Sequence, residues 1–296
     1  MRNRSESLIY HLMLLPGMLV LFLFSIIPMA GIVIAFQKFV PAKGVLHSAW
    51  VGMDNLAFMF QIPDSRQVFL NTIIIAAMKV VAGLAVPIIF ALVLNELRSS
   101  WFKRTIQTIV YIPHFISWVI LAGIITNLFS LDGIVNQLLS LFGVDPVMFL
   151  ASNFWFRPIL IGTDVWKEFG FGTIVYLAAI AGINPNLYEA AVIDGAGRFK
   201  QLMYITLPGV VPTIILLSTL SLGNILNAGF DQIFNLYNPL VYESSDIVDT
   251  YVFRVGLVEM QYGLATAVGL LKSIVAFLLI IISYMLARKL SNYRIF

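Results

Sequence analysis

Three polar side chains near the end of a long apolar stretch have the spacing and the chemistry to line a path for a solute. Asn224, Asn227 and Asp231 recur at intervals of three and four residues, which places them on one face if the segment is helical. Amide and carboxylate groups hydrogen-bond to hydroxyl groups, and a carboxylate inside a membrane is costly unless it is paired or faces water. This face is therefore expected to line a hydrated path. The alternative is that Asp231 only forms a structural ion pair with another helix.

The preceding apolar stretch carries a second group of polar side chains. Lys167 and Glu168 are adjacent, and Asp164 lies three residues before Lys167, so an ion pair along one helix is the structural alternative to a role in transport. Aromatic rings nearby can stack on a solute, although inside a membrane such rings usually pack against neighbours or lie at the interface. The aromatic candidates are Trp118, Trp166, Phe171 and Tyr176. The expected solute path comprises Lys167, Glu168, Tyr176, Asn224, Asn227 and Asp231.

The segment 184–208 reads as two short helices joined by a tight turn. Asn184 can cap the first helix, Pro185 suits its first position, and the carboxylate of Glu189 in an early turn complements the helix dipole. Ala190 and Ala191 keep one surface of this helix thin. The pattern therefore predicts a helix that begins after Asn184 and has one small surface.

The second half of this segment predicts the turn and an amphipathic helix. Gly195 and Gly197 permit a tight turn, and Pro208 is expected to end the second helix. Apolar residues recur at helical spacing between them, beside two basic residues: Phe199, Leu202, Met203 and Ile205 with Arg198 and Lys200. Such a helix pair suits docking into a groove of a partner protein. An element that lies on lipid headgroups is the alternative.

The composition indicates a protein that is embedded in a bilayer. Of the 296 residues, 60% are hydrophobic and 11% are charged, and the mean hydropathy is +0.93. The absence of cysteine excludes a disulfide framework and a thiolate metal site, and the three histidines fall in separate segments. The sequence has no G-x-x-x-x-G-K-[ST] phosphate loop and no H-E-x-x-H or G-x-S-x-G motif. We therefore expect a protein without catalytic residues, metal site or cofactor of its own.

Six stretches are long and apolar enough to cross a bilayer. The N-terminal stretch follows two arginines, as in a signal peptide, but it is too long for one and lacks a cleavage site. The expected fold is an all-α membrane protein that forms one transmembrane domain over residues 1–296. The six spans are expected at about 8–36, 69–95, 105–130, 158–181, 209–235 and 263–287.

Lysine and arginine in the connections predict the orientation. Cytoplasmic connections of membrane proteins carry an excess of these residues. With both termini cytoplasmic, the inner segments hold ten: Arg2, Arg4, Arg98, Lys103, Arg104, Arg198, Lys200, Arg288, Lys289 and Arg294. The outer loops then hold five: Lys38, Lys43, Arg66, Arg157 and Arg254. Lys79 and Lys272 fall inside the predicted spans and receive no role.

The segment after the fourth span resembles the EAA loop of the permeases of binding-protein-dependent ABC importers. Glu189-Ala-Ala-x-x-Asp-Gly-Ala196 and Ile205-Thr-Leu-Pro208 contain every element of that pattern. Trp166-Lys167 with Gly170, and Tyr262-Gly-x-Ala-Thr-Ala-Val-Gly269, resemble the carbohydrate branch of this superfamily. The resemblance extends over most of the chain.

The resemblance implies the role of each matching position. The helices around Glu189 would be coupling helices seated on a cytoplasmic ATPase, with Glu189 as a charged anchor and Gly195 in the turn. The implied coupling residues are Glu189, Ala190, Ala191, Asp194, Gly195, Ala196, Arg198, Leu207 and Pro208.

The resemblance also implies partners. These are a second, homologous permease that forms a heterodimer with this chain, two ATPase subunits that carry ATP and Mg, an extracytoplasmic solute-binding protein and a carbohydrate, which is expected to be an oligosaccharide. The implied location is a bacterial cytoplasmic membrane. No nucleic-acid partner is expected. The alternative function is an ion-coupled secondary transporter that acts alone, but the sequence shows no matched breaks in two inverted halves.

Overall fold

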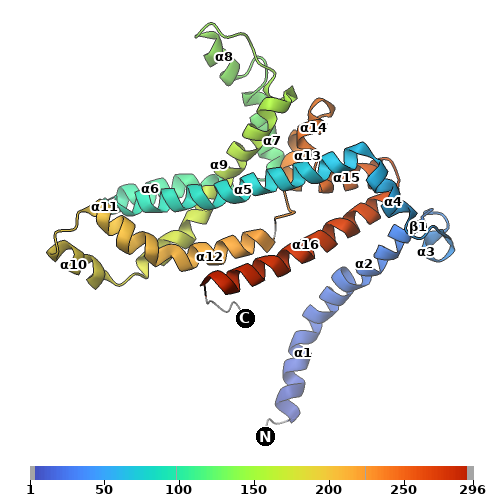
Figure 1. Ribbon diagram of the computed structural model, residues 1–296, viewed down its shortest axis with the longest axis horizontal. Helices are drawn as coiled ribbons and strands as arrows, with labels where there is room; N and C mark the ends of the chain where they lie inside the picture. Colours follow the sequence, from blue (N-terminus) through green and yellow to red (C-terminus); the bar gives the residue numbers. More distant parts are fainter. Residues whose placement is uncertain (1–3, 98, 224, 292–296) are drawn as a thin grey trace. The chain divides into compact units, whose positions relative to one another are not determined.

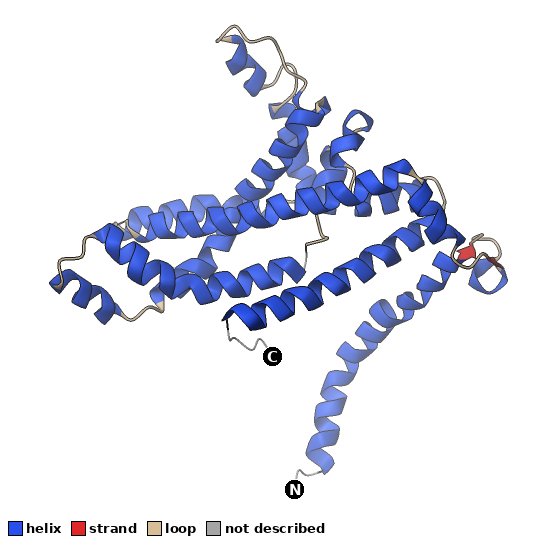
Figure 2. Cartoon of the chain, in the orientation of Figure 1, coloured by secondary structure: helices blue, strands red, loops and turns tan. Residues whose placement is uncertain are grey.

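The computed structural model describes residues 4–97, 99–223 and 225–291, and these residues are largely helical (Figure 1). Within them, strands are limited to one short antiparallel pair, β1 (Gln37–Lys38) and β2 (Ala49–Trp50), which is red in Figure 2. The prediction of an all-α membrane protein is confirmed. The chain divides into two units, Met1–Pro63 with Val252–Leu271, and Asp64–Tyr251 with Lys272–Phe296.

The first unit contains the first apolar helix and the hairpin that follows it. The amide of Asn55 donates hydrogen bonds to the carbonyls of Ala35 (2.8 Å) and Gln37 (3.1 Å), which ties the end of this helix to the segment after the hairpin. Phe39 packs edge-on against Tyr262, with ring centroids 5.7 Å apart. The helical segments are α1 (Arg4–Leu21), a π turn (Phe22–Ile26), α2 (Ile27–Met29), a 3-10 segment (Ala30–Phe36), α3 (Gly44–His47), α4 (Asp54–Gln61) and a second π turn (Arg254–Val258).

The second unit is organised around α9 (Asn153–Ala181), which contacts α6, α12, α13 and α14. Helices α5, α15 and α16 each contain residues of both units. The other helices are α5 (Pro63–Asn95), α6 (Ser100–Tyr111), α7 (Trp118–Leu128), α8 (Ile134–Ser140), α10 (Pro185–Ile193), α11 (Arg198–Gln201), α12 (Leu207–Gly223), α13 (Phe230–Leu236), α14 (Tyr242–Ser245), α15 (Val248–Phe253) and α16 (Tyr262–Ser291).

Two buried apolar clusters hold the second unit together. One contains Leu121 of α7, Phe156 and Leu160 of α9 and Ile233 of α13. The other joins α5, α9 and α12 through Ala91, Tyr176, Ile180 and Val210. Helix α9 contributes to both clusters, so its polar residues are held at fixed positions between them.

Four helical stretches of the described residues are long and apolar enough to cross a membrane: Ile9–Phe36, Asp64–Asn95, Arg198–Gly223 and Tyr262–Met285. The number rises to six if two bent pairs each count as one span: Ser100–Phe115 with Trp118–Leu128, bent by 101°, and Asn153–Ala181 with Pro185–Ile193, bent by 66°. The structure thus allows the six predicted spans, but not as six straight helices.

The predicted span at 105–130 is divided by a sharp bend of 101°. The helix changes to a 3-10 segment at Ile112–Phe115, which contains Pro113, and Ser117 then caps the separate helix α7 by accepting a hydrogen bond from the backbone N–H of Ile120. Proline has no N–H to donate and clashes with the preceding turn, and serine is a favoured N-cap residue. Together they make the bend.

Candidate functional site

The segment 184–208 forms the two predicted short helices. The side chain of Asn184 accepts a hydrogen bond of 3.0 Å from the backbone N–H of Asn186 at the start of α10. At the other end of α10, Gly195 has φ +75°, and the N–H of Ala196 donates to the carbonyl of Ala191 at 2.8 Å. Glycine adopts a positive φ readily, and this bond closes the end of the helix. The turn between α10 and α11 is therefore well defined.

Side-chain contacts attach this helix pair to the ends of α5 and α12. Arg198 forms an ion pair of 3.0 Å with Glu96, just after α5. The hydroxyl of Tyr188 lies 2.9 Å from the hydroxyl of Thr206. A cavity of about 510 Å³ lies between these elements, lined in part by Glu96, Tyr188, Arg198 and Thr206. These contacts connect the helix pair directly to the ends of α5 and α12.

The outer surface of the helix pair is apolar and exposed. Ile193 is 86% exposed and Phe199 75% exposed, and Leu187 and Val192 are also exposed. Glu189 lies among them, exposed, and its carboxylate has no ion pair or hydrogen-bond partner among the described residues. Exposed apolar side chains beside a charged residue are typical of a surface that binds a protein partner and also of an element that lies on lipid headgroups.

Pro208 does not end the second helix, contrary to the prediction. It lies near the start of α12, and the helical run from Arg198 continues to Gly223. A π turn at Leu202–Thr206 precedes it, in which the N–H of Leu207 bonds to the carbonyl of Leu202. The wider π turn accommodates a residue that has no N–H to donate. The segment 184–208 is therefore continuous with the fifth apolar helix.

Deeper in the second unit, Lys79 of α5 lies at the centre of a polar network. Its ammonium lies 2.9 Å from a carboxylate oxygen of Asp164 on α9 and donates a hydrogen bond to the side-chain oxygen of Gln232 on α13. The amide nitrogen of Gln232 donates to the carbonyl of Leu160 and to the hydroxyl of Thr163, both at 2.8 Å. One lysine thus links three helices.

The fifth span is broken beside this network, and the prediction of one helix over 209–235 was wrong. Helix α12 ends at Gly223 and α13 begins at Phe230, after Gly229 with φ +93°. A left-handed backbone at Gly229 ends helical continuity, and glycine adopts it at little cost. Asn224 lies outside the described residues. Asn227 lies in the irregular segment and Asp231 in the first turn of α13, so the two do not share one helix face.

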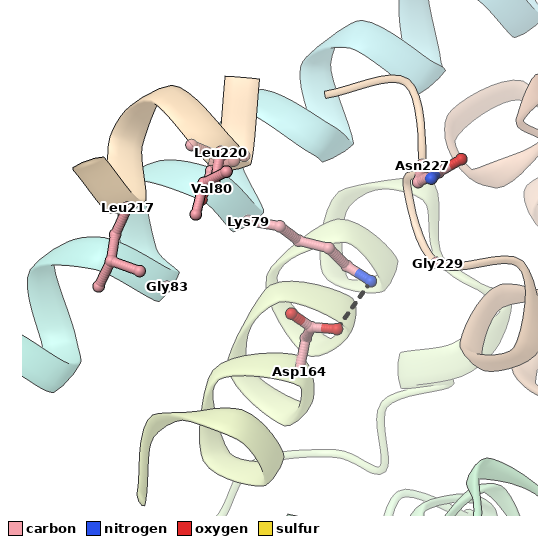
Figure 3. A pocket seen from close by; sticks show the side chains of 9 residues that line it. Lys79, Val80, Gly83, Asp164, Leu217, Leu220, Asn227 and Gly229 are labelled. Carbon is pink, nitrogen blue, oxygen red and sulfur yellow. Dashed lines mark ion pairs between the residues drawn. The ribbon is translucent and has the colours of Figure 1, made fainter. Parts of the chain in front are cut away.

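A cavity of about 380 Å³ lies between Lys79 and the irregular segment (Figure 3). Its polar lining includes Lys79, Asp164, Ser221 and Asn227, and its apolar lining includes Leu217 and Leu220. Figure 3 shows the Lys79–Asp164 ion pair at the wall of this cavity, with Asn227 on the loop that leads to Gly229.

Lys167 and Glu168 belong to a different cluster, at the bend between α6 and α7. The ammonium of Lys167 donates to the carbonyl of His114 at 2.6 Å and lies 3.2 Å from a carboxylate oxygen of Glu168. The other carboxylate oxygen of Glu168 lies 2.7 Å from Nδ1 of His114, whose ring stacks on Phe171 at 4.1 Å. Lys167 therefore does not pair with Asp164, the structural partner considered from the sequence, because Asp164 is occupied by Lys79.

The other two candidates have contrasting surroundings. Tyr176 is 2% exposed, within the second apolar cluster, and its hydroxyl has no hydrogen-bond partner among the described residues. In this structure it packs and does not reach the cavity. Asp231 is exposed, and its carboxylate has no partner among the described residues. An exposed carboxylate on a membrane helix requires water or a partner chain.

Sequence reasoning missed Lys79, Asp164 and Gln232 as a group. A signal was present, because a lysine in the middle of an apolar span is a candidate for function by default. The second missed pair is Lys272 with Asp249, at 2.5 Å, with the Lys272 ammonium also 3.3 Å from the side-chain oxygen of Asn227.

Comparisons with known proteins agree on one family. Residues 83–292 match the family described as binding-protein-dependent transport system inner membrane component. The polygalacturonan/rhamnogalacturonan transport system permease protein YteP of Bacillus subtilis (strain 168) is 42% identical over 97% of this chain and 89% of its own length. Protein LplB of the same organism is 40% identical over 97% of this chain and 90% of its own length.

A solved structure extends the likeness to the fold. It is a chain of a bacterial ABC transporter involved in the import of the acidic polysaccharide alginate, with 40% identity, a TM-score of 0.90 and coverage of 97% of both chains. A second structure of a bacterial alginate ABC transporter, in complex with an alginate pentasaccharide-bound periplasmic protein, matches at 39% identity and a TM-score of 0.90, over 98% of both chains.

Proposed function

The chain belongs to the family of binding-protein-dependent transport system inner membrane components, and we propose that it is a permease subunit of an ATP-driven importer for an acidic oligosaccharide. The observation that carries this proposal is the similarity along almost the whole chain to a polysaccharide transport permease and to a chain of an alginate importer. The exposed helix pair at 184–208 also supports this proposal. A permease that has no nucleotide site of its own needs a surface to which an ATPase subunit binds.

The helix pair is the coupling element. Ile193 and Phe199 enter an apolar cleft of the ATPase, and Glu189 meets a cation there. The tight turn at Gly195 keeps α10 and α11 in one orientation, and the Arg198–Glu96 ion pair passes motion to α5. Closure of two ATPases on ATP then shifts the permease between two states. The coupling residues are Glu189, Ala190, Ala191, Asp194, Gly195, Ala196, Arg198, Leu207 and Pro208.

The solute path runs along the polar side chains of the second unit. Asn227 lines the cavity and Asp231 is exposed one turn beyond the irregular segment, so both can meet hydroxyl groups of a passing sugar. The half-exposed side chain of Glu168 faces this path at the bend between α6 and α7, where the buried Lys167 pairs with it. Tyr176 supports this path by packing behind it, and Asn224 remains a candidate from the sequence.

The proposal of an acidic substrate is supported by the names of two proteins that match the chain over most of its length. One is a polygalacturonan/rhamnogalacturonan permease, whose polymers contain galacturonate, and one belongs to an importer of the acidic polysaccharide alginate. An oligosaccharide of uronic acid residues is therefore the best candidate.

The working complex contains more than this chain. A second homologous permease completes the path, two ATPase subunits bind ATP and Mg, and an extracytoplasmic binding protein delivers the sugar. This chain binds no cofactor itself. It lies in a bacterial cytoplasmic membrane with both termini on the cytoplasmic side, the orientation that the excess of lysine and arginine favours.

Purification of the tagged chain in mild detergent, followed by mass spectrometry and an ATPase assay, tests this proposal. Recovery of an ATPase and a second permease is expected, with ATP hydrolysis that trigalacturonate and the binding protein stimulate. A chain that is recovered alone and transports sugar without ATP would contradict it and favour a secondary transporter.

A further inference from the structure

Lys79 is a buried charge that needs an anion beside it. Its side chain is 9% exposed, in the middle of the apolar helix α5. An ammonium has three protons to donate, and two described acceptors contact it, Asp164 and Gln232. An unpaired lysine inside a membrane is strongly disfavoured, so loss of Asp164 requires another anion in its place.

Asp164 is the partner that can leave. Its side chain is 22% exposed, against 9% for Lys79, and it lines the cavity together with Lys79. Figure 3 shows its carboxylate at the end of the lysine side chain, beside the cavity. Moving the Asp164 carboxylate into a hydrated cavity therefore costs less free energy than leaving the Lys79 ammonium unpaired in an apolar environment.

The irregular segment after α12 lies close to the ammonium and forms part of the cavity wall. A Cβ at Gly229 would lie 2.6 Å from the ammonium nitrogen of Lys79, so the backbone there passes directly over it. Asn227, two residues earlier, lines the same cavity. Irregular backbone at membrane depth is tolerated where it is buried in protein or lines a water-filled cavity, and broken helices in transporters form solute sites.

We propose that the cavity beside Lys79 is a subsite for the carboxylate of an acidic sugar, which replaces Asp164 as the anion paired with Lys79. This inference rests on the proposed function. In the absence of sugar, Asp164 keeps the site neutral. A uronate residue that enters the cavity supplies its own carboxylate, and Asn227 and Ser221 are then placed for its hydroxyl groups. A neutral sugar has no carboxylate that can replace Asp164 beside Lys79. The Lys79–Asp164 pair therefore favours an acidic sugar over a neutral one.

The test compares two probes with the same sugar rings, trigalacturonate and its methyl ester, in which each carboxylate is replaced by an uncharged ester. Each chain variant is co-expressed with the subunits that co-purify with it, and ATP-dependent uptake of both probes is measured in cells that contain the same binding protein. The preference of the binding protein is then the same for all variants and cancels when their uptake ratios are compared.

Two variants should change the ratio of acid to ester uptake in opposite directions, and a third should leave it unchanged. Lys79→Gln is expected to lower it about 10- to 100-fold, the value of a hydrogen bond to a charged group. Asp164→Asn is expected to raise it, because the internal competitor for Lys79 is lost. Arg254→Gln is the control: Arg254 also pairs with an acidic residue, Glu259 at 3.8 Å, but does not line the cavity, so the ratio should stay unchanged.

The double variant Lys79→Gln/Asp164→Asn guards against misfolding, because it leaves no unpaired buried charge. It should assemble with its partners and show a low ratio of acid to ester uptake, as Lys79→Gln does. Equal losses of both probes in Lys79→Gln, with an unchanged ratio in Asp164→Asn, would show that the pair only clamps the helices, and would overturn the inference. Failure of the unmodified chain to import trigalacturonate would instead contradict the proposed substrate class.

Discussion

Replacement of Glu189 by lysine is expected to separate the permease from its ATPase without unfolding it. The Glu189 carboxylate is exposed on α10 and has no partner among the described residues, so the free energy of unfolding should change by less than about 0.5 kcal/mol. Lysine and glutamate also have similar helix propensities. An ion pair lost at an interface costs about 2–5 kcal/mol. ATPase affinity should therefore fall by at least about 30-fold.

The assay measures ATPase binding and substrate-stimulated hydrolysis in nanodiscs, with the melting temperature of the isolated chain as the check on folding. Asp145→Lys makes the same change of charge on an exposed residue outside the segment 184–208. It should leave ATPase binding and substrate-stimulated hydrolysis unchanged. Normal stimulated hydrolysis by Glu189→Lys would refute the assignment of Glu189 as the anchor.

Two glycine substitutions test the geometry of the same unit. Gly170→Ala would place a Cβ 2.1 Å from the carbonyl oxygen of Val110, so it should push α6 away from α9 and destabilise the chain by about 1–3 kcal/mol in detergent unfolding. Gly162→Ala on the same helix, with open space around it, should have little effect, and equal melting temperatures for the two would refute the contact. Gly195→Val would force a branched residue into a backbone of φ +75°, at about 1–2 kcal/mol, and should speed proteolysis of the turn. Gly197→Ala, where φ is −67°, is the control, and equal cleavage of the two would contradict the strained turn.

The apolar helices and the coupling turn could be predicted because their causes are local. Twenty apolar residues in a row are sufficient for a membrane helix, and the stretches at 8–36, 69–95 and 263–287 became long helices near those limits. The turn at Gly195 depends on one residue that adopts a positive φ. Neither feature requires knowledge of a distant part of the chain.

The polar network could not be predicted in the same way because its partners come from three helices. The sequence places Asp164 three residues from Lys167, yet its ion pair is with Lys79, 85 positions earlier. The break in the fifth span has a related explanation. Gly223 and Gly229 fit a helix or a loop, and the choice depends on the buried contacts of Gln232 and Ile233 with α9 and α7.

The long separation between Lys79 and Asp164 also affects biosynthesis. At about 5–20 residues per second, a ribosome needs roughly 4–17 s after Lys79 to reach Asp164, which follows 85 positions later. During this interval α5 must enter the bilayer with a lysine whose partner does not yet exist, at about 2.5–3.5 kcal/mol. This helix is long and apolar enough to cross a membrane despite its lysine, and its apolar side chains offset that cost. The apolar surface of α5 thus serves membrane insertion first and helix packing afterwards.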